Sequence, residues 1–258
     1  MPTLITAAGC TDVGQAREVN EDTFALHTED GVWLVADGMG GHASGQVASH
    51  MVKEKIQDFL FRWRREANFV WPFEIMESRS HIENSLVNAI RVANVRIYNR
   101  AQIDSECAKM GTTVVLMSYD PSVGFVVANV GDSRCYRLRD DELYQITEDH
   151  SLVNHLMKTY HISRAEAEKR AGSNVIVRAV GLEDDVDADL YLDMPMDGDI
   201  YMACSDGLTD LVDEWIIQNI LQGNADDPQE AAEALVRAAN QAGGTDNITV
   251  VVLNVSER

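Results

Sequence analysis

The order of the predicted elements constrains the fold of this chain most. Apolar residues recur at helical spacing from Ala48 to Trp63 and again from Ile82 to Ile97, which predicts two long helices. Strand-like runs precede and follow them, and two further helices separate strands at 200–204 and 248–255. Helix pairs that alternate with blocks of antiparallel strands predict an α+β fold. Its simplest form is two antiparallel β-sheets packed as a central sandwich and flanked by pairs of antiparallel helices.

Short polar turns separate most of the expected strands. Asp120-Pro121-Ser122 and Asp140-Asp141 are such turns, so the middle of the chain reads as an antiparallel meander. The segment 150–180 interrupts this pattern because it is polar and helical only in parts. We expect it to be a flap segment within a single catalytic domain that spans residues 1–258. The remaining expected strands are 23–28, 32–36, 112–119, 123–130, 134–139 and 142–147.

The charge of the chain excludes several kinds of partner. Its 21 Lys and Arg against 42 Asp and Glu give a net charge of -21, which disfavours nucleic acid and anionic membranes. No signal peptide and no run of transmembrane length is recognisable. The four cysteines form no C-x-x-C pair, so we expect free thiols and a cytoplasmic location. We also expect a monomer.

Acidic residues stand at the ends of several strand-like runs or just before one. Carboxylates that converge at the mouth of a sheet repel one another, and a divalent cation resolves that conflict. Oxygen ligands favour Mn²⁺ or Mg²⁺ over zinc or copper. Taken singly, each Asp-Gly pair is also a common turn, and only the set points to metal. The signatures are Glu21-Asp22, Asp37-Gly38, Asp206-Gly207 and Asp246-Asn247.

Arg17 precedes Glu21 by four residues. One interpretation is a surface salt bridge, which contributes little to stability. The other is a guanidinium that binds phosphate through two hydrogen bonds beside the metals.

Seven motifs in this chain resemble those of the metal-dependent protein phosphatases, the type 2C family, in order and spacing. The residues within these motifs are similar to those of the bacterial branch, and together the motifs span nearly the whole chain. They are R-x-x-N-E-D at 17–22, V-A-D-G-M-G-G-H at 35–42, G-T-T at 111–113, N-V-G-D-S-R at 129–134, E-D-H-S-L-V at 148–153, S-D-G-L at 205–208 and G-G-T-D-N-I-T at 243–249.

The resemblance implies a sandwich with two metal ions at one end. Asp37 would bridge both ions, and Asp206 and Asp246 would complete the first site. Glu21 and the carbonyl of Gly38 would hold the second ion.

Other positions acquire supporting roles from the same resemblance. Asp132 would hold a third, weaker ion together with Asp206. Asp22 and Asn247 would stand behind the ligands, Arg17 would bind the phosphate, and residues 150–180 would be the mobile flap.

The chain departs from the eukaryotic pattern D-G-H-G-G at one position. Met39 stands where that pattern has a histidine that is proposed as the general acid. His42 is close in sequence and is either the proton donor or a residue of a loop or helix start. The expected activity is that of a protein serine/threonine phosphatase, which hydrolyses phosphoserine and phosphothreonine with a water that bridges two metals.

Two other functions remain open from the sequence. One is a metal-dependent hydrolase of small phosphate esters, which a deep aromatic pocket would favour. The other is a non-catalytic module that binds phosphoproteins. The expected partners are phosphorylated proteins, and the enzyme would reverse the action of a bacterial serine/threonine kinase.

Overall fold

The computed structural model describes residues 3–40, 44–172 and 175–257. Its strands are β1 (Thr3–Asp12), β2 (Thr23–His27), β3 (Val32–Ala36), β4 (Gly38–Met39), β5 (Gly111–Thr112), β6 (Val114–Asp120), β7 (Gly124–Val130), β8 (Arg134–Arg139), β9 (Glu142–Gln145), β10 (Asp189–Asp193), β11 (Ile200–Cys204) and β12 (Ile248–Glu257). Its helices are α1 (Ser44–Arg65), α2 (His81–Ile103), α3 (Leu152–Tyr160), α4 (Arg164–Ala171), α5 (Asp206–Thr209), α6 (Glu214–Gly223) and α7 (Pro228–Gln241), with 3₁₀ turns at Thr28–Asp30 and Ser105–Cys107.

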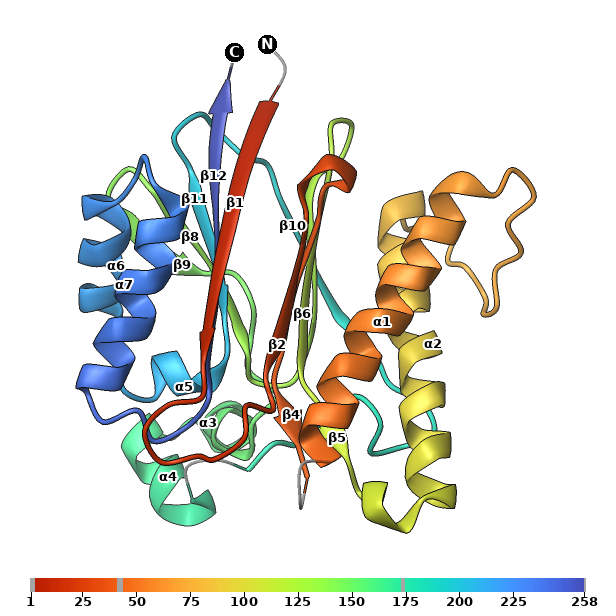
Figure 1. The fold of residues 1–258 in the computed structure, drawn as a ribbon, viewed down its shortest axis with the longest axis horizontal. Helices are drawn as coiled ribbons and strands as arrows, with labels where there is room; N and C mark the ends of the chain where they lie inside the picture. Colours follow the sequence, from red (N-terminus) through yellow and green to blue (C-terminus); the bar gives the residue numbers. More distant parts are fainter. Residues whose placement is uncertain (1–2, 41–43, 173–174, 258) are drawn as a thin grey trace.

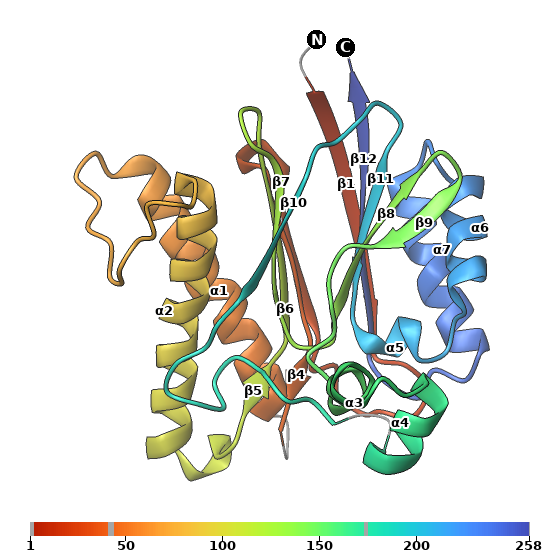
Figure 2. The ribbon, with the colours of Figure 1, turned by 180° about the vertical axis from the view of Figure 1, so that it is seen from behind.

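Two five-stranded antiparallel sheets form the centre of the molecule (Figure 1). The first sheet has the order β1-β12-β11-β8-β9 and the second has the order β10-β7-β6-β3-β2. Helices α6 and α7 cover the outer face of the first sheet, and α1 and α2 cover the outer face of the second (Figures 1 and 2). The predicted sandwich with flanking helix pairs is therefore confirmed.

Most central strands are buried on both faces, so alternate side chains enter different cores. On β12, Val251 and Leu253 face the other sheet and pack between the two sheets. Val250 and Val252 point the other way and pack against α6 and α7. On β3, Trp33 lies between the sheets whereas Leu34 packs under α1 and α2. The two outer cores fix the helices to the sheets, and the inner core fixes the sheets to each other.

In the two large sheets, β1 and β10 were not expected from the sequence. β1 pairs with β12 over its whole length, from Thr3 opposite Glu257 to Asp12 opposite Ile248. β10 is the edge strand beside β7. Both strands are mostly only partly buried and carry polar residues, so their apolar alternation is weak.

Side chains cap the starts of two helices. Ser80 and Glu83 form a capping box at the start of α2. Asp227 caps α7 by accepting hydrogen bonds from the backbone N–H groups of Gln229 and Glu230. Asp213 precedes α6 but makes no side-chain cap. None of the helices in the described part of the chain is long and apolar enough to cross a lipid bilayer.

Candidate active site

One end of the sandwich collects the predicted acidic residues. Asp37 follows β3, Asp206 follows β11 and Asp132 lies in the connection from β7 to β8. Asp22 and Asp246 lie just before β2 and β12. All of these strand ends meet where α5, β4 and the start of α1 lie, and the two chain ends lie at the opposite end (Figure 1).

The carboxyl groups in this acidic centre disturb one another strongly. Burial raises the pKa of Asp37 well above its usual value, and the charges of Asp22, Asp206 and Asp132 raise it further. Burial also raises the pKa of Asp22 to about 7 and that of Asp206 to about 6. Burial and the charge of Asp206 raise the pKa of Asp132 to about 7. Four neighbouring acids with raised pKa values mark a place where the protein gathers negative charge at a cost in stability.

Several oxygens of this centre have no hydrogen-bond partner. The Oδ1 atoms of Asp22, Asp132 and Asp206 are all inaccessible to solvent and unpaired. The other carboxyl oxygen of Asp22 accepts a hydrogen bond from the Ser205 hydroxyl at 2.8 Å. Buried polar atoms normally find partners, so three unpaired carboxyl oxygens at one place call for an explanation.

Divalent cations fit this set of donors. The unpaired oxygens of Asp22, Asp132 and Asp206 are carboxylate oxygens, which are the ligands that Mn²⁺ and Mg²⁺ prefer. Within residues 3–40, 44–172 and 175–257, no three acidic, histidine or cysteine side chains are arranged as a complete metal site. The fit therefore rests on the unpaired oxygens and not on a finished ligand shell.

Two threonines hold Asp37 in place, and the sequence analysis gave them no role. The hydroxyl of Thr113 accepts a hydrogen bond from the Asp37 N–H at 3.0 Å. The Asp37 carbonyl accepts hydrogen bonds from the Thr112 hydroxyl at 2.8 Å and from the Thr113 N–H at 2.8 Å. Thr113 also hydrogen bonds to the Ser133 hydroxyl at 2.7 Å, next to Asp132. The G-T-T and G-D-S-R motifs therefore connect two of the acidic positions.

Glu21 and Gly38, which the resemblance implies as holders of the second ion, lie close together. The Gly38 N–H donates to the Glu21 carbonyl at 3.2 Å, and Glu21 Oε1 accepts from the N–H of Gly45 at 3.1 Å. A Cβ atom on Gly38 would lie 2.1 Å from the Gly45 carbonyl oxygen, and one on Gly45 would lie 2.7 Å from Glu21 Oε1. Only glycines permit this approach. Gly45, in the first turn of α1, is a site residue that the motifs did not reveal.

Asn247 fastens the loop that carries Glu21 to the start of β12. Its side-chain carbonyl accepts from the Glu21 N–H at 2.8 Å, and its amide donates to the carbonyls of Val13 and Val19. The side chain is buried, which agrees with a supporting role.

Arg17 pairs with Asp246 and not with Glu21. The two side chains meet at 2.8 Å, and that of Arg17 is 50% exposed. Its guanidinium therefore lies at the rim of the acidic centre, where it can also face a ligand. Asp246 raises the pKa of Asp206, so it belongs to the same electrostatic group. His42 lies outside the described residues.

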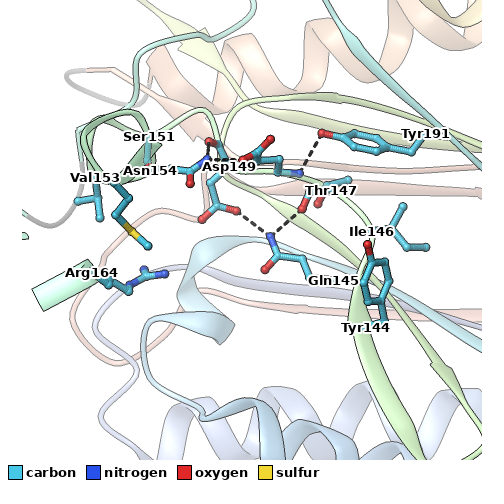
Figure 3. A pocket seen from close by; sticks show the side chains of 12 residues that line it. Tyr144, Gln145, Ile146, Thr147, Asp149, Ser151, Val153, Asn154, Arg164 and Tyr191 are labelled. Atoms are coloured by element: carbon cyan, nitrogen blue, oxygen red, sulfur yellow. Dashed lines mark hydrogen bonds between the residues drawn. The ribbon is translucent and has the colours of Figure 1, made fainter. Parts of the chain in front are cut away.

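The base of the flap segment contains a second group of buried charges. Arg134 forms hydrogen bonds of 2.9 Å and 2.7 Å with the carboxylate of Asp149. Gln145 donates to the same carboxylate at 3.0 Å, as Figure 3 shows. His150 accepts from the Gly131 N–H at 3.0 Å and lies 3.1 Å from the carboxylate of Asp189. These contacts join the flap segment to the loop that carries Asp132.

Two adjoining cavities lie beside the acidic centre. A small cavity of about 20 Å³ is lined by Asp132, Asp206 and Asp210 together with residues of the flap. It shares Asp149 and Arg164 with a cavity of about 470 Å³ between β9 and α3, shown in Figure 3. The tyrosines of the larger cavity, Tyr144 and Tyr191, do not line the small one.

Comparisons with known proteins agree with this geometry. The family model described as protein phosphatase 2C matches residues 14–236. A serine/threonine phosphatase Stp of Listeria innocua is 36% identical over 246 residues, which cover 94% of this chain and 93% of that protein.

Solved structures match over the same length. The serine/threonine phosphatase of S. agalactiae superposes with a TM-score of 0.83 at 32% identity and covers 98% of this chain and 100% of that one. The catalytic domain of the serine threonine protein phosphatase PstP, in complex with two manganese ions, superposes with a TM-score of 0.81 at 32% identity. The match covers 99% of this chain and 100% of that one.

Proposed function

The chain belongs to the protein phosphatase 2C family and is a metal-dependent serine/threonine protein phosphatase, and we propose that the acidic centre at the end of the sandwich is where it hydrolyses its substrates. One observation carries the proposal. Three carboxyl oxygens there are buried and unpaired, and the pKa values of their groups are raised to about 6 or 7. Divalent cations would both pair these oxygens and favour their ionised form.

The site residues divide into two groups of ligands. Asp37 is the proposed bridge, with Asp206 and Asp246 on one side and Glu21 and the Gly38 carbonyl on the other. The contacts of Glu21 and Gly38 with the first turn of α1 support the second group. When bound, two such cations lower the pKa of a shared water and neutralise phosphoryl oxygens.

A third, weaker ion would be held by Asp132 and Asp206. The small cavity between these two residues and the flap supports this assignment. Both Mn²⁺ and Mg²⁺ prefer oxygen ligands, so the type of ligand does not distinguish between them.

Arg17 is the proposed phosphate-binding residue. Its exposed guanidinium already contacts Asp246 at the rim, so it can turn one face to a phosphate while the carboxylate keeps it in place. Asp22 and Asn247 would act behind the ligands, because the first accepts from Ser205 and the second fixes the Glu21 backbone.

The shape of the site favours a protein substrate over a small phosphate ester. The cavity at the acidic centre is about 20 Å³ and has no aromatic lining. Such a site accepts a phosphate that projects from a larger body, whereas small esters need a pocket that surrounds them. A module that only binds phosphoproteins would have no need of these unpaired carboxylates.

We further propose that the substrates are phosphoproteins made by a serine/threonine kinase and that the enzyme is a cytoplasmic monomer. The four cysteines are all free, which suits a reducing compartment. Residues 150–180 would be a flap within one catalytic domain that spans residues 1–258. Its two helices, α3 and α4, border the cavity beside the acidic centre and support this role.

Turnover of a phosphothreonine peptide and of an aryl phosphate tests the proposal. Both reactions should stop in excess EDTA and resume when Mn²⁺ is added back. Persistent turnover of both substrates in EDTA would contradict the metal mechanism. Turnover of the aryl phosphate alone, with no activity on any of a panel of phosphopeptides, would favour the small-ester hydrolase.

A further inference from the structure

The helix pair α1 and α2 differs in charge from the rest of the molecule. Residues 44–103 contain nine Lys and Arg against six Asp and Glu, whereas the remainder contains twelve against thirty-six. The pair covers one outer face of the sandwich (Figure 1). A chain with a net charge of -21 therefore presents one layer that attracts anions.

A cavity of about 440 Å³ opens between α1 and α2 in this layer. Its apolar lining comes from Phe59 on α1, Val92 on α2 and the connection between the two helices, which adds Phe69, Val70 and Pro72. Phe59 and Phe69 meet edge to face with ring centroids 5.2 Å apart. Aromatic packing of this kind gives the cavity a firm apolar floor.

Three cations stand around this floor. Lys55, Arg62 and Arg96 line the cavity together with one acidic residue, Asp58. Lys55 pairs with Glu54 and Arg62 pairs with Glu66, and both pairs are partly or largely exposed. Arg96 is exposed and has no hydrogen-bond or ion-pair partner among the described residues. The lining therefore carries three cations and one acid around an apolar floor, and two of the cations would have to exchange a surface carboxylate for that of a ligand.

The connection beside the cavity adds apolar surface. Val70 is 83% exposed, and Met76 is 50% exposed. Val70 lines the cavity, and exposed apolar side chains at a hollow are typical of binding surfaces. The cavity is remote from the acidic centre, because Arg62 lies seventeen residues along α1 from Gly45, or roughly 25 Å at 1.5 Å per residue.

We propose that this cavity is a docking site for an acidic peptide segment of a partner protein, anchored by one bulky apolar side chain. The hollow receives the anchor, and the three cations pair with carboxylates on either side of it. An anionic membrane fits less well, because a flat surface leaves the hollow unfilled and the net charge of -21 repels the bilayer.

A labelled peptide tests the proposal in the full-length protein. The probe has twelve residues, with one central tryptophan between runs of glutamate, and its binding is followed by fluorescence anisotropy. Affinity should fall with added salt. It should also fall at least tenfold when serine replaces the tryptophan or lysines replace the glutamates.

Matched variants locate the binding. The double variant Arg62→Glu/Arg96→Glu should weaken binding at least tenfold, and Val92→Phe, which fills the hollow without changing charge, should do the same. The control Arg65→Glu/Arg237→Glu changes the net charge equally outside the cavity and should stay within about threefold of wild type. Melting curves establish that each variant is folded.

Three results would overturn the proposal. The first is no binding of the acidic peptide by the wild-type protein. The second is equal binding by the cavity variants and the control. The third is binding to phosphatidylglycerol vesicles, lost in Arg62→Glu/Arg96→Glu, without any binding of the peptide. The variant Asp206→Asn should bind the peptide like wild type, so failure of the catalytic proposal leaves this test unaffected.

Discussion

Two groups of buried charge lie at the same end of the sandwich, and they are built in opposite ways. At the base of the flap, Arg134 and Asp149 face each other at 2.7 Å with side chains only 10% and 12% exposed, and Gln145 completes the carboxylate. In the acidic centre, Asp132 and Asp206 each keep a buried oxygen without a partner. The flap base therefore contains positive and negative side chains that pair with each other, whereas the acidic centre contains only negative ones.

The difference separates structural charge from functional charge. Burial lowers the pKa of Arg134, but the hydrogen bond to Asp149 outweighs it and raises that pKa overall, so the guanidinium stays charged. In the acidic centre the carboxyls raise one another's pKa instead. Buried charge that the fold leaves uncompensated destabilises the protein, so its retention indicates a ligand that compensates it.

The largest expected effect is on catalysis, through the unpaired group. Asp206→Asn should lower kcat/KM by more than about 100-fold, because a proposed ligand of two ions is lost. Melting in EDTA should show a stability equal to wild type or higher, since one repelling carboxylate is gone. Asp141→Asn, in an exposed turn, is the matched control. Near-normal turnover in Asp206→Asn would remove this residue from the site.

The paired group should respond in the opposite sense. Arg134→Ala leaves Asp149 buried without its partner and should lower the free energy of unfolding by about 3–5 kcal/mol. Arg237→Ala, which removes an exposed ion pair, should change it by about 0–1 kcal/mol. Denaturant titration measures both. If Arg134→Ala unfolds like Arg237→Ala, the flap base does not carry the structural role assigned to it.

The pH dependence of stability offers a third test. The folded protein keeps protons on Asp22 and Asp132 up to about pH 7, whereas these groups in the unfolded chain release them near the ordinary value of 3.8. In EDTA the free energy of unfolding should therefore fall as the pH rises from about 4 to about 7, by roughly 4 kcal/mol for each of the two groups.

Saturating Mn²⁺ should remove most of this decline, because the ions pair the ionised carboxylates. Asp22→Asn should flatten the profile in EDTA. A stability in EDTA that rises over the same interval would show that the carboxyls are compensated within the protein itself.

Arg17 shares a feature with each of the two groups. It is paired with a carboxylate, like Arg134, but it lies at the rim of the acidic centre. Arg17→Ala should lower kcat/KM by about 10–100-fold, mostly through KM, since a charge-assisted hydrogen bond contributes roughly 1.5–3 kcal/mol. Melting should hardly change, because the pair with Asp246 is exposed. Arg17→Lys should recover part of the loss. Unchanged KM and kcat would reduce Arg17 to a surface ion-pair partner.

The smallest effect should come from the flap. Most charges on α4 pair with one another, as Arg170 does with Glu166, but Arg164 also lines the cavities beside the acidic centre. Arg164→Glu should change rates on phosphopeptides by roughly fivefold, or about 1 kcal/mol, and leave an aryl phosphate nearly untouched. Arg170→Glu should change neither. An equal fall on both substrates would make Arg164 part of the catalytic machinery.

Most of the architecture was predictable from local patterns. The stripe from Ala48 to Trp63 and the buried run from Ile248 to Val255 have strong periodicity or length, and both elements are present. β1 and β10 escaped prediction because their side chains are largely half-buried and their place in the sheets depends on distant partners. Pairing between Thr3 and Glu257 leaves no signal in the local sequence.

The acidic positions were predictable because each carries a motif, but their partners were not. Arg17 pairs with a residue 229 positions away and not with its neighbour in sequence. The role of Gly45 depends on the approach of α1 to Gly38, which only the packed structure reveals.

The pairing of β1 with β12 also has a consequence for biosynthesis. β1 is an edge strand, and the strand that it pairs with is β12, with Thr3 opposite Glu257 and Asp12 opposite Ile248. Contacts so distant in sequence form late and slowly. On the ribosome, the nascent chain would hold an exposed sheet edge and lack Asp246 until the final strand emerges. The phosphatase therefore cannot assemble its acidic centre before β12 has been translated, which makes β1 and the edge of β11 the surfaces that need protection from aggregation during synthesis.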